Sequence, residues 1–439
     1  MKASKKIIKY KKERVVISDI LPYEIPLTFS NRHFYDFITK CKIEIDEDKI
    51  KWKDSKPIIA DIIKLLFGIR LDKQPVNNTI KIDKRATIPF NYKISHKESD
   101  FRELTIIHPK SQLDVVAFYE NFKELIIYFS SISNYSIRRP YKISKYRYFK
   151  DKTHKINLAT GEEYEGLEEN DKEYENLRTF FVYKNYSNIH KFYESYKYHR
   201  CEKKYNKLFK FDISKCFDSI YTHSICWALL NKEIVKSNLG LSAKTFGGKF
   251  DLLMQWLNYN ETNGIVIGPE FSRIFAELIL QKIDTVVESK LKEHKLFHKK
   301  DYETFRYVDD FFVFYNDPST KDFLLQSYRL LFKEYKLSVN DAKTILYEKP
   351  LITEITIAKE KISNLLNKYL VYNLEDADNS EIDGDPKISG NIYVSANKLI
   401  TKFKAIIKES KIDYKDILNF TLAIVERKVF RILKQHHVL

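Results

Sequence analysis

The 439-residue sequence has no long hydrophobic run and no paired cysteines. No apolar stretch approaches the roughly 18 residues of a membrane-spanning helix, and none precedes a small-residue cleavage site of the kind that follows a signal peptide. The four cysteines stand far apart, without the spacing of a zinc site or a disulfide framework. We therefore expect a cytoplasmic protein with reduced thiols, at Cys41, Cys201, Cys216 and Cys226.

Acidic residues are outnumbered, and the formal net charge of +16 predicts attraction to a polyanion. An anionic membrane is the weaker alternative, because no strongly amphipathic anchor accompanies the charge. Residues 1–14 are either a functional basic arm or a solvated terminus. In residues 138–150 cations alternate with aromatic rings without an acid, which suits phosphates and stacked bases, or else an exposed strand pair. The candidate nucleic-acid contacts are Lys142, Lys145, Arg147 and Lys150.

The order of periodic segments predicts a mixed α/β (α+β) protein in four parts. A basic N-terminal arm (1–27) precedes a mostly helical region (28–206), in which residues 151–175 read as an acidic surface insertion. Short apolar strands alternate with helices over 207–350. The C-terminal region, 351–439, is predicted to be helical near 352–371, 393–409 and 413–435.

Two acidic motifs on apolar strands carry the chemistry. Asp309 and Asp310 stand between aromatic, β-branched strands, so they should lie at a hairpin turn, where an Asp pair alone is usually only a solvated feature. Asp212 ends a buried strand, where an unpaired carboxylate is disfavoured. Two Mg²⁺ ions, with Mn²⁺ as the alternative, would resolve this and would clamp an attacking 3′-oxygen and a leaving pyrophosphate. The predicted metal site is Asp212, Ile213, Asp309 and Asp310.

Two further segments lie near these acids in sequence order. Gly264 and Gly268 precede an amphipathic helix, either to admit a ligand close to the backbone or simply to turn the chain. Lys343 stands at a loop–strand junction, where it could protonate or neutralise pyrophosphate, or be an ordinary surface lysine.

The order of these motifs resembles the reverse-transcriptase palm over about 207–350: an F-D-I-x-x-x-F-x-x-I block, a Gly-rich loop and helix, a Y-x-D-D hairpin and an N-x-x-K-T segment. The resemblance implies a right-hand polymerase with fingers, palm and a C-terminal helical thumb-like or appendage region. More narrowly, several segments look like those of bacterial antiphage-defence and abortive-infection reverse transcriptases: 219–225 and 268–277 in the palm, and 101–104, 107–109 and 136–140 in the fingers.

This resemblance implies an RNA-directed or RNA-associated DNA polymerase acting in antiphage defence. Phe217, five positions after Asp212, would exclude a ribose 2′-hydroxyl, unless it is only a core aromatic. The implied partners are a noncoding RNA template or scaffold, the DNA product, deoxynucleoside triphosphates, and either a second copy of the chain or an operon-encoded protein. The remaining nucleotide-site candidates are Arg102, Arg138, Arg139, Gly268 and Lys343.

One departure from the family pattern keeps alternatives open. Retroelement enzymes carry Pro-Gln in the Gly-rich loop, whereas this sequence has Val266 and Ile267, so the amide that would meet the template is absent. Template-independent or protein-primed DNA synthesis is one alternative, and an RNA-making enzyme is another. A non-catalytic RNA-binding scaffold with a polymerase shape is the third. His223 is expected to be a hydrogen-bonding core residue rather than a catalyst.

Overall fold

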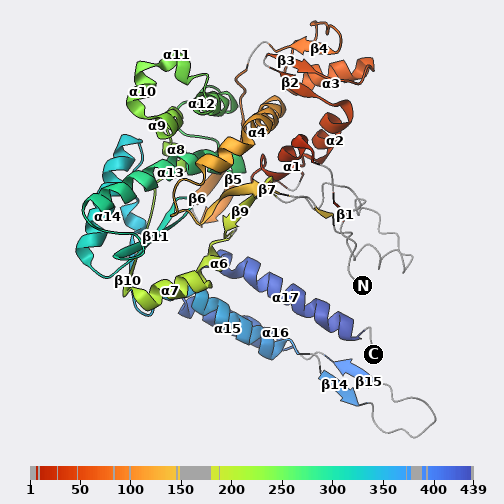
Figure 1. Ribbon diagram of the computed structural model, residues 1–439. Coiled ribbons are helices and arrows are strands. Elements are labelled where there is room, and N and C mark those ends of the chain that lie inside the picture. The colour runs from red at the N-terminus through yellow and green to blue at the C-terminus, as the bar shows by residue number, and fades with distance from the viewer. Residues whose placement is uncertain are drawn as a thin grey trace, which may run out of the picture. The chain divides into compact units, whose positions relative to one another are not determined.

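The computed structural model describes residues 6–7, 10–26, 28–46, 48–82, 85–97, 100–144, 147–148, 179–186, 188–371, 373–376, 388–391 and 394–436. The chain forms two compact units, residues 1–346 and 347–439 (Figure 1). The predicted mixed α/β class is confirmed. The predicted insertion at 151–175 lies outside the described residues, and the predicted part boundaries at 27, 206 and 350 stay predictions.

The first unit is organised around a four-stranded sheet with the order β11-β12-β10-β13. Its strands are β10 (Lys207–Asp212), β11 (Tyr302–Tyr307), β12 (Asp310–Tyr315) and β13 (Ile345–Glu348). Both β10 and β11 pair antiparallel with β12. The predicted buried strand and the predicted hairpin are therefore confirmed.

Aromatic side chains cover both faces of this sheet, because successive residues of a strand point to opposite faces. On one face Phe211 stacks on Phe311 with ring centroids 4.6 Å apart, and Tyr328 of α14 (Pro318–Glu334) packs against them. On the other face Phe312 contacts Phe192 of α6 (Ile189–Tyr193). The sheet is thus held between helices, which fixes the ends of β10 and β12 where the acids stand.

The long helix α13 (Glu270–Glu293) follows the Gly-rich loop and packs on α14 and α9. Its predicted apolar face is confirmed, since Phe271, Ile274, Phe275, Leu278, Ile279 and Ile283 are all buried. Between β10 and the Gly-rich loop the chain forms several helices. They are α8 (Cys216–Ser219), α9 (Ser224–Leu230), α10 (Lys232–Ser237), α11 (Leu239–Ser242) and α12 (Phe246–Leu257).

The region 28–206 is less helical than predicted. The long helix α4 agrees with the prediction of a mostly helical region, but several strands also form here. The helices are η1 (Lys12–Arg14), α1 (Val15–Ser18), α2 (Arg32–Cys41), α3 (Pro57–Phe67), α4 (Pro109–Phe129) and α7 (Tyr196–Lys204). The strands are β1 (Lys6–Ile7), β2 (Glu44–Asp46), β3 (Lys49–Lys51), β4 (Thr79–Lys81), β5 (Phe90–Lys97), β6 (Asp100–Ile106), β7 (Arg138–Ile143), β8 (Arg147–Tyr148) and β9 (Phe181–Asn185).

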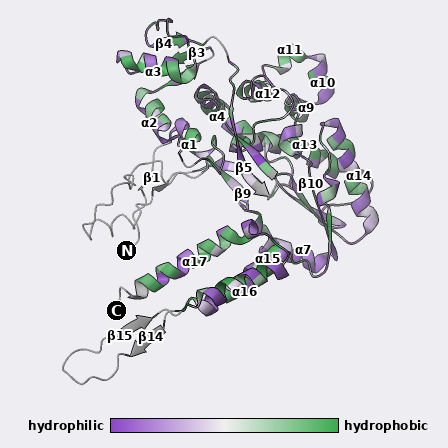
Figure 2. Cartoon of the chain, turned by 180° about the vertical axis from the view of Figure 1, so that it is seen from behind, coloured by the Kyte–Doolittle hydropathy of each residue, from purple (hydrophilic) through white to green (hydrophobic). Residues whose placement is uncertain are grey.

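The second unit is helical, as predicted, with each helix carrying hydrophobic and hydrophilic residues along its length (Figure 2). Its small core contains Ala358, Ile362, Leu366, Ile407 and Ile417. Among the residues that the structure describes, no helix has both the length and the apolar character needed to cross a membrane. Its elements are α15 (Glu354–Tyr369), β14 (Asn373–Asp376), β15 (Ile388–Asn391), α16 (Ala396–Glu409) and α17 (Tyr414–His436). The 3-10 turn η2 (Asp341–Lys343) precedes them and belongs to the first unit.

Candidate active site

The three predicted acids meet at one end of the sheet. Asp212 is the last residue of β10 and Asp310 the first of β12, and the two are direct cross-strand partners. Cβ atoms of such partners lie about 5 Å apart. Asp309 stands in the two-residue turn that joins β11 to β12. The strand pairing therefore brings together three carboxylates that are nearly a hundred positions apart in sequence.

Burial and neighbouring negative charge raise the proton affinity of Asp309 and Asp310. Desolvation, followed by the charges of Asp309 and Asp212, raises the pKa of Asp310 to about 6, although the outer side of this side chain is exposed. Burial and then the Asp212 charge also raise the pKa of Asp309. Asp212 Oδ2 accepts a hydrogen bond from Lys343 Nζ at 3.0 Å, and this bond raises the pKa of Lys343. A cluster of like charges of this kind is characteristic of functional sites.

The residues present fit a divalent cation in their chemistry. Asp212 is only 7% exposed, and its Oδ1 is buried without a hydrogen-bond partner among the described residues. Such an orphaned oxygen, beside two further carboxylates, is what a hard cation would satisfy. As placed, no three His, Cys, Asp or Glu side chains of the described residues form a ligand set. Ile213 lies just beyond Asp212, in a bridge with Val339.

A cleft of about 790 Å³ adjoins the acids, a volume typical of pockets for small organic ligands. Asp309 and Asp310 line it, as do four of the predicted nucleotide-site residues: Arg102, Arg138, Phe217 and Gly268. Phe217 is half-buried on α8 and packs partly against the core, so both interpretations of this ring, gate and core aromatic, remain compatible with its position. Arg102 is exposed on β6.

The wall of the cleft includes a segment near the N-terminus that sequence reasoning did not implicate. Ile17, Leu21, Pro22 and Tyr23 line the cleft together with Gly268. Gly268 has a φ of +119°, and a Cβ added there would meet Pro22 Cγ at 2.6 Å, so only glycine fits.

Asp19 anchors this wall to the rest of the unit. Its carbonyl accepts from Glu270 N at 2.8 Å, and its carboxylate accepts from Phe180 N at 2.8 Å. Burial raises the pKa of Asp19 to about 7. The segment therefore joins the start of α13 to the residues before β9.

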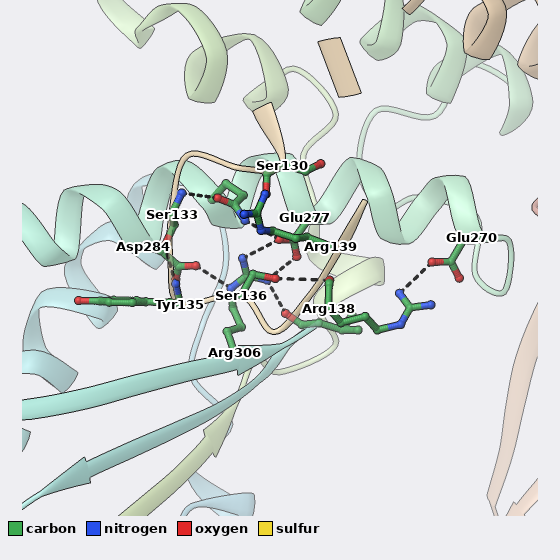
Figure 3. Close-up of polar contacts among 12 residues, drawn as sticks. Ser130, Ser133, Tyr135, Ser136, Arg138, Arg139, Glu270, Glu277, Asp284 and Arg306 are labelled. Carbon is green, nitrogen blue, oxygen red and sulfur yellow. Dashed lines mark hydrogen bonds and ion pairs between the residues drawn. The ribbon is translucent and has the colours of Figure 1, made fainter. Parts of the chain in front are cut away.

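Arg138 is held at the cleft by a buried acid. Arg138 Nη1 lies 2.8 Å from Glu270 Oε1 (Figure 3). Arg273 Nη1 lies 2.8 Å from Glu270 Oε2. The Arg138 guanidinium also stacks over the Tyr183 ring at 4.2 Å. Burial would raise the pKa of Glu270, but the two arginines outweigh it and hold that pKa below the usual range. Two cations share one anion here, which leaves a positive charge facing the cleft.

The other predicted contacts do not gather at the cleft. Arg139 is buried and donates to the Ser130 carbonyl at 3.1 Å, and it is not among the described residues that line the cleft. Alternation along β7 separates Arg139 from Arg138. Lys142 is exposed on β7, and the backbone of Arg147 belongs to β8, which pairs with β1. Lys145 and Lys150 lie outside the described residues.

Sequence reasoning missed an ionic cluster beneath the turn that carries Asp309. Arg306 of β11 is fully buried and bonds to Glu277 and Asp284, which both project from α13 (Figure 3). A usable signal was present. An arginine inside an otherwise aromatic strand needs buried partners, and two acids seven positions apart on the apolar face of α13 are suitably placed to provide them.

His223 also differs in detail from its expected core position. Its Nδ1 lies 2.5 Å from Asp251 Oδ2, and Gln255 Nε2 donates to Asp251 Oδ1 at 2.7 Å. The His223 side chain is 42% exposed and lines a separate cavity of about 530 Å³ between α9 and α12. It is hydrogen-bonded as expected, but it is not buried.

One family model matches the part of the chain that contains these acids. Residues 170–372 match the family model described as reverse transcriptase (RNA-dependent DNA polymerase). No curated protein matches the chain.

Similar solved structures include yeast telomerases, and the chain spans only about half the length of some of them. Apo telomerase from Candida tropicalis is 11% identical with a TM-score of 0.36, covering 90% of this chain and 68% of that one. The same enzyme truncated from its C-terminal domain is 12% identical with a TM-score of 0.34, covering 61% and 51%. Telomerase from Candida albicans, in complex with a TWJ fragment of telomeric RNA, is 12% identical with a TM-score of 0.34, covering 73% and 56%.

Proposed function

We propose, because residues 170–372 match the reverse transcriptase family model, that the protein adds deoxynucleotides to a DNA 3′ end by two-metal catalysis at Asp212, Asp309 and Asp310. The observation that carries the proposal is the meeting of these three acids beside a cleft that Asp309 and Asp310 line, with one Asp212 oxygen buried and unsatisfied. Lys343 satisfies only the other oxygen of Asp212, and a hard cation is a suitable ligand for the oxygen that is left.

Each group around the cleft has a defined task in this reaction. Asp212, Asp309 and Asp310, with Ile213 beside them, would hold Mg²⁺ or Mn²⁺. The bound cations would stabilise the negative charge of the attacking 3′-oxygen and of the departing pyrophosphate. Lys343, already hydrogen-bonded to Asp212, is the cation available to neutralise or protonate pyrophosphate.

We assign nucleotide selection to other residues that line the cleft. Arg102 and Arg138 present guanidinium groups that suit triphosphate oxygens. Phe217 would meet a ribose 2′-hydroxyl, and Gly268 lets the backbone approach the nucleotide. The buried position of Arg139 favours a structural task for that residue instead.

We further propose that this activity serves bacterial antiphage defence in the cytoplasm, with a noncoding RNA as template or scaffold. This finer assignment rests on the sequence segments at 219–225 and 268–277, together with the segments 101–104, 107–109 and 136–140. The net charge of +16 and the exposed Lys142 are compatible with a nucleic-acid partner. A second copy of the chain or an operon-encoded protein would complete the assembly.

The decisive experiment measures incorporation of labelled deoxynucleotides by the purified protein with Asp309→Ala and Asp310→Ala combined. We expect no product, because the cations lose two ligands. Asp322→Ala is the control, since this exposed acid of α14 pairs with its neighbour Lys321 and does not line the cleft in the part of the chain that the structure describes. Undiminished synthesis by the double variant would refute the proposal.

Phage challenge of cells carrying the same variants separates enzyme from scaffold. Loss of protection with the double variant supports polymerisation as the defensive activity. Retained protection would favour the RNA-binding scaffold. Sequencing the nucleic acid that copurifies with the unaltered protein then distinguishes templated synthesis, in which an RNA complementary to the product is recovered, from template-independent or protein-primed synthesis.

A further inference from the structure

Arg306 is an arginine with no access to solvent and an unusually complete set of partners. Its Nε donates to Asp284 Oδ2 at 2.8 Å, and its Nη1 and Nη2 donate to the two carboxylate oxygens of Glu277 at 2.7 and 3.2 Å (Figure 3). Tyr328 donates to the other oxygen of Asp284 at 3.1 Å. Desolvating an arginine and two acids is unfavourable and is offset only by good geometry, so such a cluster calls for a reason beyond packing.

A fourth hydrogen bond gives that reason. Arg306 Nη1 also donates to the carbonyl oxygen of Val308 at 2.9 Å. Val308 is the first residue of the turn between β11 and β12, and Asp309 is the second. The guanidinium therefore holds, by a hydrogen bond, the peptide group that joins Val308 to Asp309.

Val308, whose carbonyl accepts this hydrogen bond, has a backbone conformation that valine rarely adopts. Val308 has a φ of +58°, in the left-handed region. Two-residue hairpins commonly place glycine or asparagine there, and a β-branched side chain with positive φ is strained. Strain of this kind persists only where the surroundings enforce it, and it gathers at functional sites.

We propose that Arg306 is a positioning residue, which holds the Val308 carbonyl and so fixes the strained turn that presents Asp309 to Asp212 and the cleft. Glu277 and Asp284 orient the guanidinium, and α13 thereby governs the geometry of the acidic hairpin. The catalytic part of this inference rests on the proposed function, but the structural part does not.

The arginine fork is needed because one side chain must satisfy three groups at once. Lysine keeps the positive charge for Glu277 and Asp284, but its single ammonium group cannot match the bidentate geometry and also reach the turn. Arg306→Lys therefore tests positioning with the charge retained, and Arg306→Gln removes both. Arg139 provides the matched control, because it is also a buried arginine that bonds a backbone carbonyl, that of Ser130.

The experiment combines these variants with Val308→Gly, since glycine adopts positive φ without strain. In the full-length protein we expect Arg306→Gln and Arg306→Lys to speed hydrogen exchange in the peptide covering 305–312. We expect them to lower kcat by about 10- to 100-fold, with KM for the nucleotide changed by less than about threefold, because the loss falls on the reacting geometry. Adding Val308→Gly to either Arg306 variant should raise kcat about tenfold above that of the Arg306 variant alone. In the Arg139→Gln background it should restore nothing.

Two results would overturn the proposal. One is exchange in 305–312 that responds equally to Arg306→Lys and Arg139→Gln, which would mean that the turn does not depend on Arg306. The other is a kcat deficit that Val308→Gly leaves unchanged in the Arg306→Lys protein, whose retained charge guards against a simple failure to fold. If the unaltered protein incorporates no nucleotide, the proposed function fails, and the exchange measurement still decides the positioning role.

Discussion

Replacing Gly268 by alanine should break the contact between the Gly-rich loop and the N-terminal wall of the cleft. The added Cβ would stand 2.6 Å from Pro22 Cγ and 2.7 Å from Pro22 Cβ, distances that real Cβ atoms do not tolerate. In addition, the φ of +119° is one that an L-residue rarely adopts. Steric overlap and backbone strain therefore act together at this position.

The two contributions can be sized and separated. Forcing a non-glycine residue into such a conformation costs about 1–3 kcal/mol. Overpacking costs about 1–3 kcal/mol more, so the free energy of unfolding should fall by about 2–6 kcal/mol. Pro22→Gly removes both of the closest atoms and leaves only Pro22 Cα at 3.3 Å, so it should recover the overpacking part in the double variant.

Tryptophan fluorescence during urea unfolding measures this change selectively. All three tryptophans, Trp52, Trp227 and Trp256, lie in the first unit, so the signal reports on that unit. Gly240→Ala is the control, because nothing lies within 4 Å of its added Cβ. The nucleotide KM should rise in parallel, since the displaced loop lines the cleft. A Gly268→Ala protein as stable as the Gly240→Ala protein would refute the reasoning, as would a double variant without recovery.

Four further outcomes are expected. The folded-state pKa of Asp310, about 6, lies above its ordinary value, so its contribution to stability is full below about pH 4 and is lost as pH rises through 6. Asp310→Asn should remove that decline in stability, measured by urea unfolding without divalent cations. An unchanged pH profile would contradict this prediction. Phe217→Ala should improve ribonucleotide use relative to deoxynucleotides in single-turnover incorporation, whereas equal selectivity would make the ring a core aromatic. Lys343→Met should lower kcat by about 100-fold, more than it raises KM, and a change in KM alone would assign Lys343 to binding. Lys142→Gln should reduce the slope of log affinity against log salt by about 1 in RNA-binding titrations, and no change in slope would exclude a phosphate contact.

Local patterns in the sequence predicted the parts of the site that depend on neighbouring residues. Alternating aromatic residues around Asp309 and before Asp212 predicted β11, β12 and β10, and the apolar spacing after Gly268 predicted α13. These patterns are strong because each face of each element is buried against a helix or strand. The chemical roles of the acids, of Phe217 and of Lys343 stay predictions, since the structure places these residues without testing what they do.

Contacts between distant segments could not be read from such patterns. Nothing near Pro22 marks it as the neighbour of Gly268, and the spacing of Arg138 and Arg139 does not say which one faces the cleft. The strands β2, β3 and β4 were missed because a strand of three residues is too short to show a period. The longer β5 and β6 were missed as well. Arg306 was passed over because a charged residue beside a catalytic motif is more often read as a surface group than as a buried clamp.

The attachment of Asp19 has a consequence for the order in which the chain matures. Its carboxylate can accept its hydrogen bond only after Phe180 has been synthesised, 161 residues further along the chain. Its carbonyl needs the backbone N–H of Glu270, which is synthesised later still. At translation rates of about 5–20 residues per second, Phe180 is synthesised roughly 10–30 s after Asp19. The wall of the cleft therefore closes only after most of the first unit has been synthesised. Until those partners have been synthesised the N-terminal wall of the cleft cannot form, and slowed translation would lengthen that interval.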